Sequence, residues 1–200
     1  MGHDVEKIKA GIDDIIIKTL ITAQPELWHV YRSCQPEDYE NSLCFQVLGF
    51  DIMIDDTLKP WLIEVNHAPS FATESPFDLN LKSKLLEDTF RILNLTQKKK
   101  NFLLCQARVQ FQRRILTGKI QKLSQEEKDS KRAEYDAYRD QQEPAVAGGY
   151  RMIYPIRDNE IKAARFAKML DTARDHYDYF SSGGKKGKEP GSLKSMREEE

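Results

Sequence analysis

The chain has 200 residues, of which 40% are hydrophobic and 32% are charged. This length holds one ordinary domain with an appendage and excludes a large multidomain enzyme. Its 31 basic and 32 acidic residues nearly cancel, which excludes a uniformly basic nucleic-acid binder and an acidic disordered protein.

The first predicted element is a helix near the amino terminus. Apolar residues recur at three- and four-residue spacing from Val5 to Leu20, which predicts an amphipathic helix over residues 4–23. Pro25 follows, and we expect residues 24–41 to form a connection without regular structure.

Two apolar runs come next. Leu43–Ile54 and Pro60–Val65 are rich in strand-forming residues, and Asp55, Asp56 and Thr57 give a turn between them. The pattern predicts a hairpin of buried strands joined by a loop of about five residues.

The following part of the chain is predicted to be helical. A helix is expected after Leu79, and the compact domain is expected to end near Leu95. Residues 101–116 and 124–142 lack strand patterning and are rich in helix formers, so two further helices are predicted there.

The carboxyl-terminal part begins with residues that interrupt helices. Pro144 and the pair Gly148-Gly149 are expected to break the chain. A last helix is predicted from Asp158, a good N-cap, to about Tyr179, and the tail from residue 181 has a disordered composition.

The cysteines and the apolar segments bear on the compartment. Cys34, Cys44 and Cys105 cannot all pair, and the last two lie within or beside apolar stretches, as buried free thiols do. The amino terminus lacks the basic-then-apolar pattern of a signal peptide. We therefore expect a reducing compartment.

Positive charge is concentrated in one segment. Residues 97–122 contain eight basic residues and no acidic one, which leaves a net charge of −9 on the other 174 residues. The apolar residues between these cations are expected to supply a docking face. The basic residues are Lys98, Lys99, Lys100, Arg108, Arg113, Arg114, Lys119 and Lys122.

The strand pair carries three side chains with oxygen donors. Glu64 and Asn66 lie two residues apart, so strand alternation puts them on one face, and Asp51 lies in the facing strand, where an unpaired buried carboxylate would be costly. Two carboxylates and an amide oxygen suit magnesium. The alternative is that Asp51 hydrogen-bonds the turn and Glu64 pairs with Lys59.

The sequence around these residues resembles that of a known family. Residues 49–55 read GFDIMID and residues 59–66 read KPWLIEVN, which closely resembles the last two core strands of the tubulin tyrosine ligase-like enzymes, amino-acid ligases of the ATP-grasp superfamily. The similar text runs from the first helix to about Gly118. Residues 67–71, HAPSF, are most similar to the glutamate-adding polyglutamylase branch.

The resemblance implies a reaction and roles for four residues. Asp51, Glu64 and Asn66 would bind the magnesium ions that bridge the phosphates of ATP, and His67 would contact the acceptor glutamate chain. An acceptor carboxylate would be phosphorylated, and the amine of an incoming glutamate would displace the phosphate. The alternative for His67 is a polar residue that caps the loop.

The basic segment resembles the cationic extension with which several tubulin glutamylases bind microtubules. The resemblance implies that acidic tubulin tails are the partner, with salt-sensitive association. Nucleic acid fits the charge but has no supporting motif, and a merely solvated basic helix is the third alternative. The cations expected at the microtubule are Lys98, Lys99, Lys100, Arg108, Arg113 and Arg114.

The expected fold is α+β: the C-terminal portion of an ATP-grasp domain, with an antiparallel strand pair flanked by helices, then helical segments and a disordered tail. The expected divisions are the ATP-grasp part over residues 1–96, the cationic helix over 97–122, a mixed-charge helical extension over 123–180 and the tail over 181–200.

The expected function is that of a tubulin polyglutamylase that uses ATP and Mg²⁺. Only 43 residues precede Cys44 and no Gly-rich phosphate loop occurs, so we expect a fragment without the nucleotide-binding lobe that is inactive alone. The alternative is a non-catalytic microtubule-binding module or short isoform. A monomer without membrane contact is expected in the cytoplasm and cytoskeleton, with the cilium, axoneme and basal body as natural settings. The preference for α- or β-tubulin, initiation against elongation and the role of residues 123–200 stay open.

Overall fold

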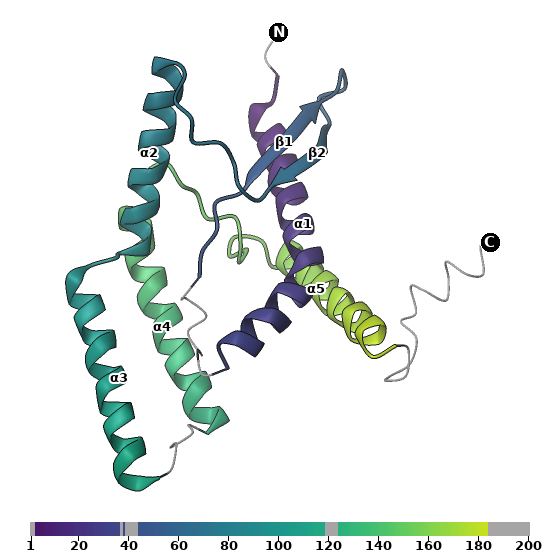
Figure 1. Cartoon of the computed structure of the whole chain (residues 1–200). Coiled ribbons are helices and arrows are strands. Elements are labelled where there is room, and N and C mark those ends of the chain that lie inside the picture. The colour runs from purple at the N-terminus through teal and green to yellow at the C-terminus, as the bar shows by residue number, and fades with distance from the viewer. Residues whose placement is uncertain (1–2, 37, 39–43, 119–123, 184–200) are drawn as a thin grey trace. The chain divides into compact units, whose positions relative to one another are not determined.

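The computed structural model describes residues 3–36, 38, 44–118 and 124–183 (Figure 1). Within these residues the chain forms helices and one two-stranded antiparallel sheet, which confirms the α+β class. The elements are α1 (Val5–Cys34), β1 (Gly49–Ile54), β2 (Pro60–Asn66), α2 (Pro76–Leu93), α3 (Gln97–Thr117), α4 (Gln125–Val146) and α5 (Glu160–Ser181).

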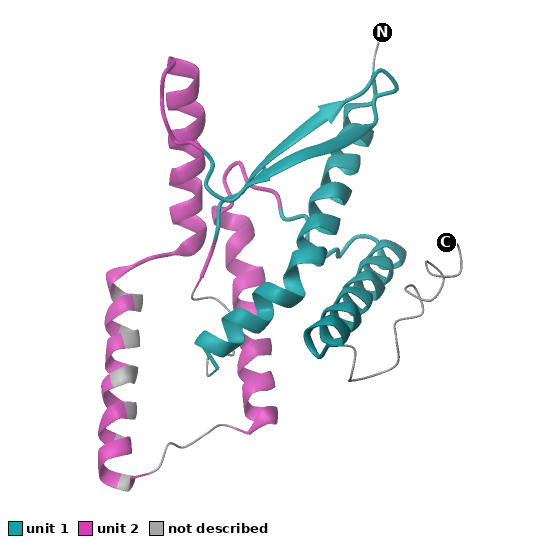
Figure 2. Ribbon diagram, turned by 45° about the vertical axis from the view of Figure 1, so that its right-hand side comes forward, with its two compact units in different colours: residues 1–37, 46–69, 152–200 teal, residues 38–45, 70–151 magenta. Residues whose placement is uncertain are grey.

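The chain divides into two compact units, coloured separately in Figure 2. Unit 1 consists of residues 1–37, 46–69 and 152–200, and unit 2 consists of residues 38–45 and 70–151. These units interleave along the sequence, whereas the expected domain divisions run consecutively, so those divisions stay a prediction. The tail expected from residue 181 lies outside the described residues after residue 183.

Helix α1 of unit 1 is longer than the sequence pattern predicted. It begins after Asp4, whose side chain accepts a hydrogen bond from the backbone N–H of Lys7, and it continues through Pro25 to Cys34. A proline inside a helix removes a hydrogen bond and bends the axis, and Figure 1 shows α1 bending between its halves. The predicted end before Pro25 is wrong because Pro25 is buried and the next turns pack on α5, where the His29 ring lies 5.9 Å from that of Tyr177.

The core of unit 1 lies between α1 and α5. Ile17 and Ile21 of α1 pack with Phe166 of α5, which is fully buried. Beside them, the Lys162 ammonium lies 2.7 Å from the Asp14 carboxylate and joins the same two helices. Helix α5 begins one residue later than predicted, because Asn159 and not Asp158 is the N-cap that accepts from the N–H of Lys162.

The hairpin in unit 1 has the predicted pairing and loop length, but β1 begins at Gly49 and not at Leu43. The prediction of buried strands is wrong, because most residues of β2 are exposed. Helix α1 packs against β2, and a Cβ added to Gly11 would lie only 2.9 Å from Pro60. The register shifts between Asp51 and Ile52, which leaves Ile63 as an extra residue in β2, a β-bulge.

In unit 2, α2 and α4 have well-formed amino-terminal caps. The Ser75 hydroxyl accepts from the N–H of Asp78 at the start of α2. At the start of α4, Ser124 and Glu127 exchange hydrogen bonds in a capping box. Pro144, expected to break the chain, lies inside the last turns of α4, which ends at Val146.

A buried carboxylate in α2 holds the turn that follows α4. Asp88 is 1% exposed and accepts a hydrogen bond of 2.8 Å from the backbone N–H of Gly149. Next to it, the hydroxyls of Thr89 and Tyr150 lie 2.6 Å apart. These contacts explain the glycine, because Gly148 has φ +60° and its α-carbon faces the Asp88 carboxylate with no room for a side chain.

The cysteines are free, as predicted, but Cys34, Cys44 and Cys105 are all exposed. The expectation of burial was wrong because Cys44 precedes the sheet and Cys105 lies on α3, whose described side chains are solvent-exposed. In the described part of the chain, no helix combines the length and the apolar character that crossing a bilayer requires.

Candidate functional site

The candidate metal-binding face is the side of the hairpin that carries Asp51, Glu64 and Asn66. Asp51 and Glu64 are register partners in neighbouring strands, so their side chains project from the same face, with Cβ atoms about 5 Å apart. Asn66 lies two residues beyond Glu64, and its amide nitrogen donates to the Glu64 carboxylate at 3.1 Å. The hairpin therefore brings together the three side chains that the sequence singled out.

The charges on this face are not neutralised by neighbouring side chains. Among the described residues, the Asp51 carboxylate has no hydrogen-bond or ion-pair partner, and the Glu64 carboxylate has only the Asn66 amide. Asp51 is exposed, so the expectation that burial makes its charge costly was wrong: the strand face carrying it is open to solvent. Two like charges directly opposite each other destabilise a strand pair, and a bound cation would remove that repulsion.

The hairpin turn is held by Asp55, which the sequence reasoning had treated only as a turn residue. One carboxylate oxygen accepts from the N–H of Thr57 at 2.9 Å, the hydroxyl of Thr57 at 2.6 Å and the N–H of Lys59 at 2.9 Å. The other accepts from the indole N–H of Trp61 at 2.7 Å. These hydrogen bonds, with those from Thr57 and Trp61 the largest causes, lower the pKa of Asp55 to about 2.

This geometry does not support the alternative roles of Asp51 at the turn and of Glu64 as the partner of Lys59. Asp55, not Asp51, accepts the hydrogen bonds of the turn. Lys59 does not pair with Glu64, because its ammonium lies 3.7 Å from the centre of the Trp61 ring in a cation–π contact. Lys59 and Trp61 are therefore residues of the hairpin edge. The Asp-Asp-Thr sequence of the turn was the signal that could have identified the role of Asp55.

The donor set on the face fits magnesium. No cluster of three or more His, Cys, Asp or Glu side chains able to hold a metal occurs among the residues that the structure describes. Magnesium is commonly bound by one or two carboxylates and completes its shell with water and substrate phosphate oxygens. Asp51 and Glu64 supply the carboxylates, and the side-chain oxygen of Asn66 is an additional hard donor.

His67 directly follows this face and is exposed. Its backbone carbonyl accepts a hydrogen bond of 3.1 Å from the side-chain amide of Gln46, which anchors the start of the loop after β2. The contact to the acceptor chain that the resemblance implies for its imidazole stays a prediction.

Helix α3 carries the predicted cationic segment. Lys100, Arg108 and Arg114 are exposed, whereas the side chains of Lys98, Lys99 and Arg113 lie outside the described residues, as do Lys119 and Lys122. The docking face expected from the apolar residues of this segment stays a prediction, and helical periodicity distributes the described ones over two sides. Among the described side chains of α3, the exposed apolar ones are Leu104, Val109, Phe111, Ile115 and Leu116.

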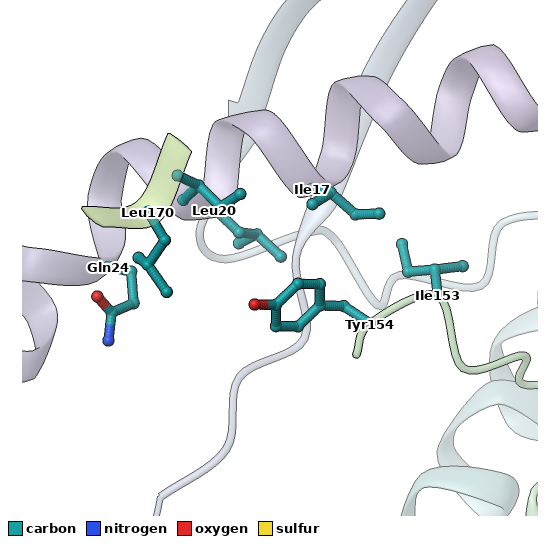
Figure 3. Close-up of a pocket in the computed structure, with 7 residues that line it drawn as sticks. Ile17, Leu20, Gln24, Ile153, Tyr154 and Leu170 are labelled. Atoms are coloured by element: carbon teal, nitrogen blue, oxygen red, sulfur yellow. The ribbon is translucent and has the colours of Figure 1, made fainter. Parts of the chain in front are cut away.

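An apolar pocket of about 150 Å³ lies beside the core of unit 1 (Figure 3). Ile17 and Leu20 of α1 and Ile153 and Leu170 line it, together with Tyr154 and Gln24. Its lining holds no charged side chain, and its polar groups are limited to the Tyr154 hydroxyl and the Gln24 amide. The hairpin face is thus the stronger candidate for chemistry.

Comparison with known proteins identifies the family of this chain. Residues 2–102 match the model of the tubulin-tyrosine ligase family. The chain is 44% identical over 159 residues to a probable beta-tubulin polyglutamylase of Tetrahymena thermophila, covering 80% of this chain and 13% of the relative. It is 43% identical over 154 residues to tubulin polyglutamylase TTLL6 of Mus musculus, covering 77% and 19%. It is 32% identical over 221 residues to tubulin polyglutamylase TTLL7 of Xenopus tropicalis, covering 99% and 24%.

Proposed function

Because the chain belongs to the tubulin-tyrosine ligase family, we propose that it carries the metal-binding hairpin of a tubulin polyglutamylase. This enzyme would add glutamate, at the expense of ATP, to glutamate side chains of the tubulin C-terminal tails. The observation that carries the proposal is the juxtaposition of Asp51, Glu64 and Asn66 on one exposed face. The chain spans between 13% and 24% of these relatives' lengths. In the proposed enzyme it would contribute the C-terminal part of an ATP-grasp domain.

The hairpin residues would act by position and charge. Bound Mg²⁺ would offset the repulsion between ATP phosphates and an acceptor carboxylate. Asp51 and Glu64 would hold the cation from facing strands, and the hydrogen bond from Asn66 would orient the Glu64 carboxylate toward it. The phosphorylated acceptor carboxylate would then react with the amine of the incoming glutamate, releasing phosphate.

His67 and α3 would contact the protein substrate. His67 directly follows Asn66 and its carbonyl accepts a hydrogen bond from Gln46, which supports the proposal that its imidazole would contact an approaching acceptor glutamate. The cations Lys98, Lys99, Lys100, Arg108, Arg113 and Arg114 would bind the acidic surface and tails of microtubules. The setting would be the cytoplasmic cytoskeleton, including cilia.

The metal site can be tested by Mn²⁺ titration, with Mn²⁺ as a spectroscopic substitute for Mg²⁺. Asp51→Asn and Glu64→Gln should each weaken binding at least about tenfold, which corresponds to about 1.4 kcal/mol. In metal-free buffer the same substitutions should raise the urea midpoint slightly, because they remove a like-charge pair. Weaker Mn²⁺ binding together with higher stability in metal-free buffer is expected of a metal-binding carboxylate and not of a carboxylate that stabilises the fold.

The matched control is Asp56→Asn in the exposed loop of the same hairpin, which changes the charge equally without touching the face. It should alter neither Mn²⁺ affinity nor stability. Equal Mn²⁺ affinity in Asp51→Asn and the unsubstituted chain would remove the hairpin from consideration as the metal site.

A second candidate, a non-catalytic microtubule-binding module, is favoured by the exposed cations of α3. The purified chain should co-sediment with microtubules in a salt-sensitive way and lose binding when the six cations become Glu. It should not ligate glutamate by itself. Glutamate incorporation by the purified chain that Asp51→Ala abolishes would show instead that these 200 residues are sufficient for activity.

A further inference from the structure

Among the described side chains of α3, the apolar ones form two separate stripes. Leu104, Phe111 and Ile115 form the first stripe and are 51%, 64% and 66% exposed. Val109 and Leu116 form the second and are 40% and 83% exposed. At about 100° per residue, the two stripes lie about 130° apart around the helix axis. Residues of this size are seldom left in water together unless they mark an interaction surface.

Exposed cations border the first stripe on its two sides. Lys100 and Arg114 lie on one side of it by helical position, and Arg108 lies on the other, toward the second stripe. No acidic residue occurs between residues 97 and 122. A partner must therefore offer apolar surface in two places, with negative charge along its rims.

This arrangement discriminates between kinds of partner. A bilayer surface or the wall of a filament can cover only one side of a helix and would leave one stripe in water. A protein with two apolar grooves that closes around a helix covers both, and acidic groove rims then meet the cations. We propose that α3 is the target helix of an acidic, helix-clasping protein of the calcium-sensor EF-hand type.

The binding itself goes beyond the ligase activity and does not depend on it. One consequence does rest on the proposed function: a clasped α3 cannot present Lys100, Arg108 and Arg114 to a microtubule. Calcium loading of the sensor would then release the chain from its substrate.

The test is calorimetric titration of the full chain with calmodulin as the probe, with calcium and with chelator. Binding should need calcium and have a Kd at or below about 1 μM. Leu104→Ser/Phe111→Ser and Val109→Ser/Leu116→Ser, one pair for each stripe, should each weaken it at least about tenfold. Ile161→Ser/Phe180→Ser on α5, which removes two residues 86% and 62% exposed, is the control and should bind normally. Circular dichroism checks that each variant keeps its helices.

Absence of calcium-dependent binding would overturn the inference. Loss of binding in only one of the two stripe variants would also overturn it, because the partner would then contact a single face. If the chain binds phosphatidylserine vesicles and only the first-stripe variant loses that binding, the first stripe is a membrane-binding face. Microtubule co-sedimentation with and without calcium-loaded calmodulin separates the two proposals. Calmodulin binding by a chain that does not bind microtubules would keep this inference and remove the microtubule contact.

Discussion

Gly148 provides the most discriminating stability experiment. Its φ of +60° disfavours any side chain, and an ideal Cβ there would lie 2.2 to 2.4 Å from the three terminal atoms of the Asp88 carboxyl group. That carboxylate has little freedom to move. It accepts from the N–H of Gly149 at 2.8 Å and faces the Lys84 ammonium at 3.5 Å and the Arg91 guanidinium at 3.2 Å. Gly148→Ala should therefore destabilise unit 2 by two separate effects.

The structure supplies a control that isolates one of them. Gly118 has almost the same backbone angle, φ +63°, but an added Cβ would meet nothing within 4 Å. Gly118→Ala should cost about 1–2 kcal/mol from the left-handed backbone alone. Gly148→Ala should cost that amount and about 1–3 kcal/mol more, because overpacking at the carboxylate is added.

The assay is urea unfolding followed by far-ultraviolet circular dichroism, since Trp28 and Trp61 both lie in unit 1 and do not report on unit 2. The excess cost of Gly148→Ala should disappear in an Asp88→Ala background, where the clashing atoms are gone. Equal costs for Gly148→Ala and Gly118→Ala, or an excess that persists without Asp88, would refute the steric explanation.

Two further predictions concern unit 1. The folded-state pKa of Asp55 is depressed to about 2, so its contribution to hairpin stability is present above its ordinary pKa of 3.8 and is lost as the pH falls toward 2. In a Trp28→Phe chain, Trp61 fluorescence should therefore stay constant down to about pH 4 and change toward pH 2. The Asp55→Asn substitution should abolish that transition. Phe166→Ala should cost about 3–5 kcal/mol in urea unfolding, whereas Phe180→Ala, at a 62% exposed position of the same helix, should cost under about 0.5 kcal/mol, and similar costs would contradict the core assignment.

The sequence predicted the elements whose signals are local. The two apolar runs around Asp55 and Asp56 predicted the hairpin and its five-residue loop, and helix-forming composition predicted α3 and α4. Strand alternation placed the side chains of Glu64 and Asn66 on one face, whereas the position of Asp51 opposite Glu64 depends on the register shift in β2, which no local pattern predicted. Structural elements that depend on residues close together in the sequence could therefore largely be predicted.

Features that depend on tertiary contacts could not be predicted from the sequence. Pro25 reads as a helix end, yet packing of α1 on α5 extends the helix past it. The apolar composition of β2 reads as burial, yet in the described structure α1 packs on this strand and most of its residues stay exposed. The fixed turn at Gly148 depends on Asp88, 60 residues earlier, and no local pattern reveals such a pairing.

The bulge at Ile63 changes which residues of β2 face each side of the hairpin. Glu64 and Trp61 are three residues apart, an odd spacing that in a regular strand would put them on opposite faces, yet both pair on the Asp51 side, opposite Asp51 and Met53. If Ile63 instead paired opposite Asp51 without a bulge, simple alternation would turn Glu64 and Asn66 to the other face, away from Asp51 and Trp61. In this hairpin the bulge at Ile63, as much as the identity of the residues, keeps the loop anchor and the candidate metal ligands on one side.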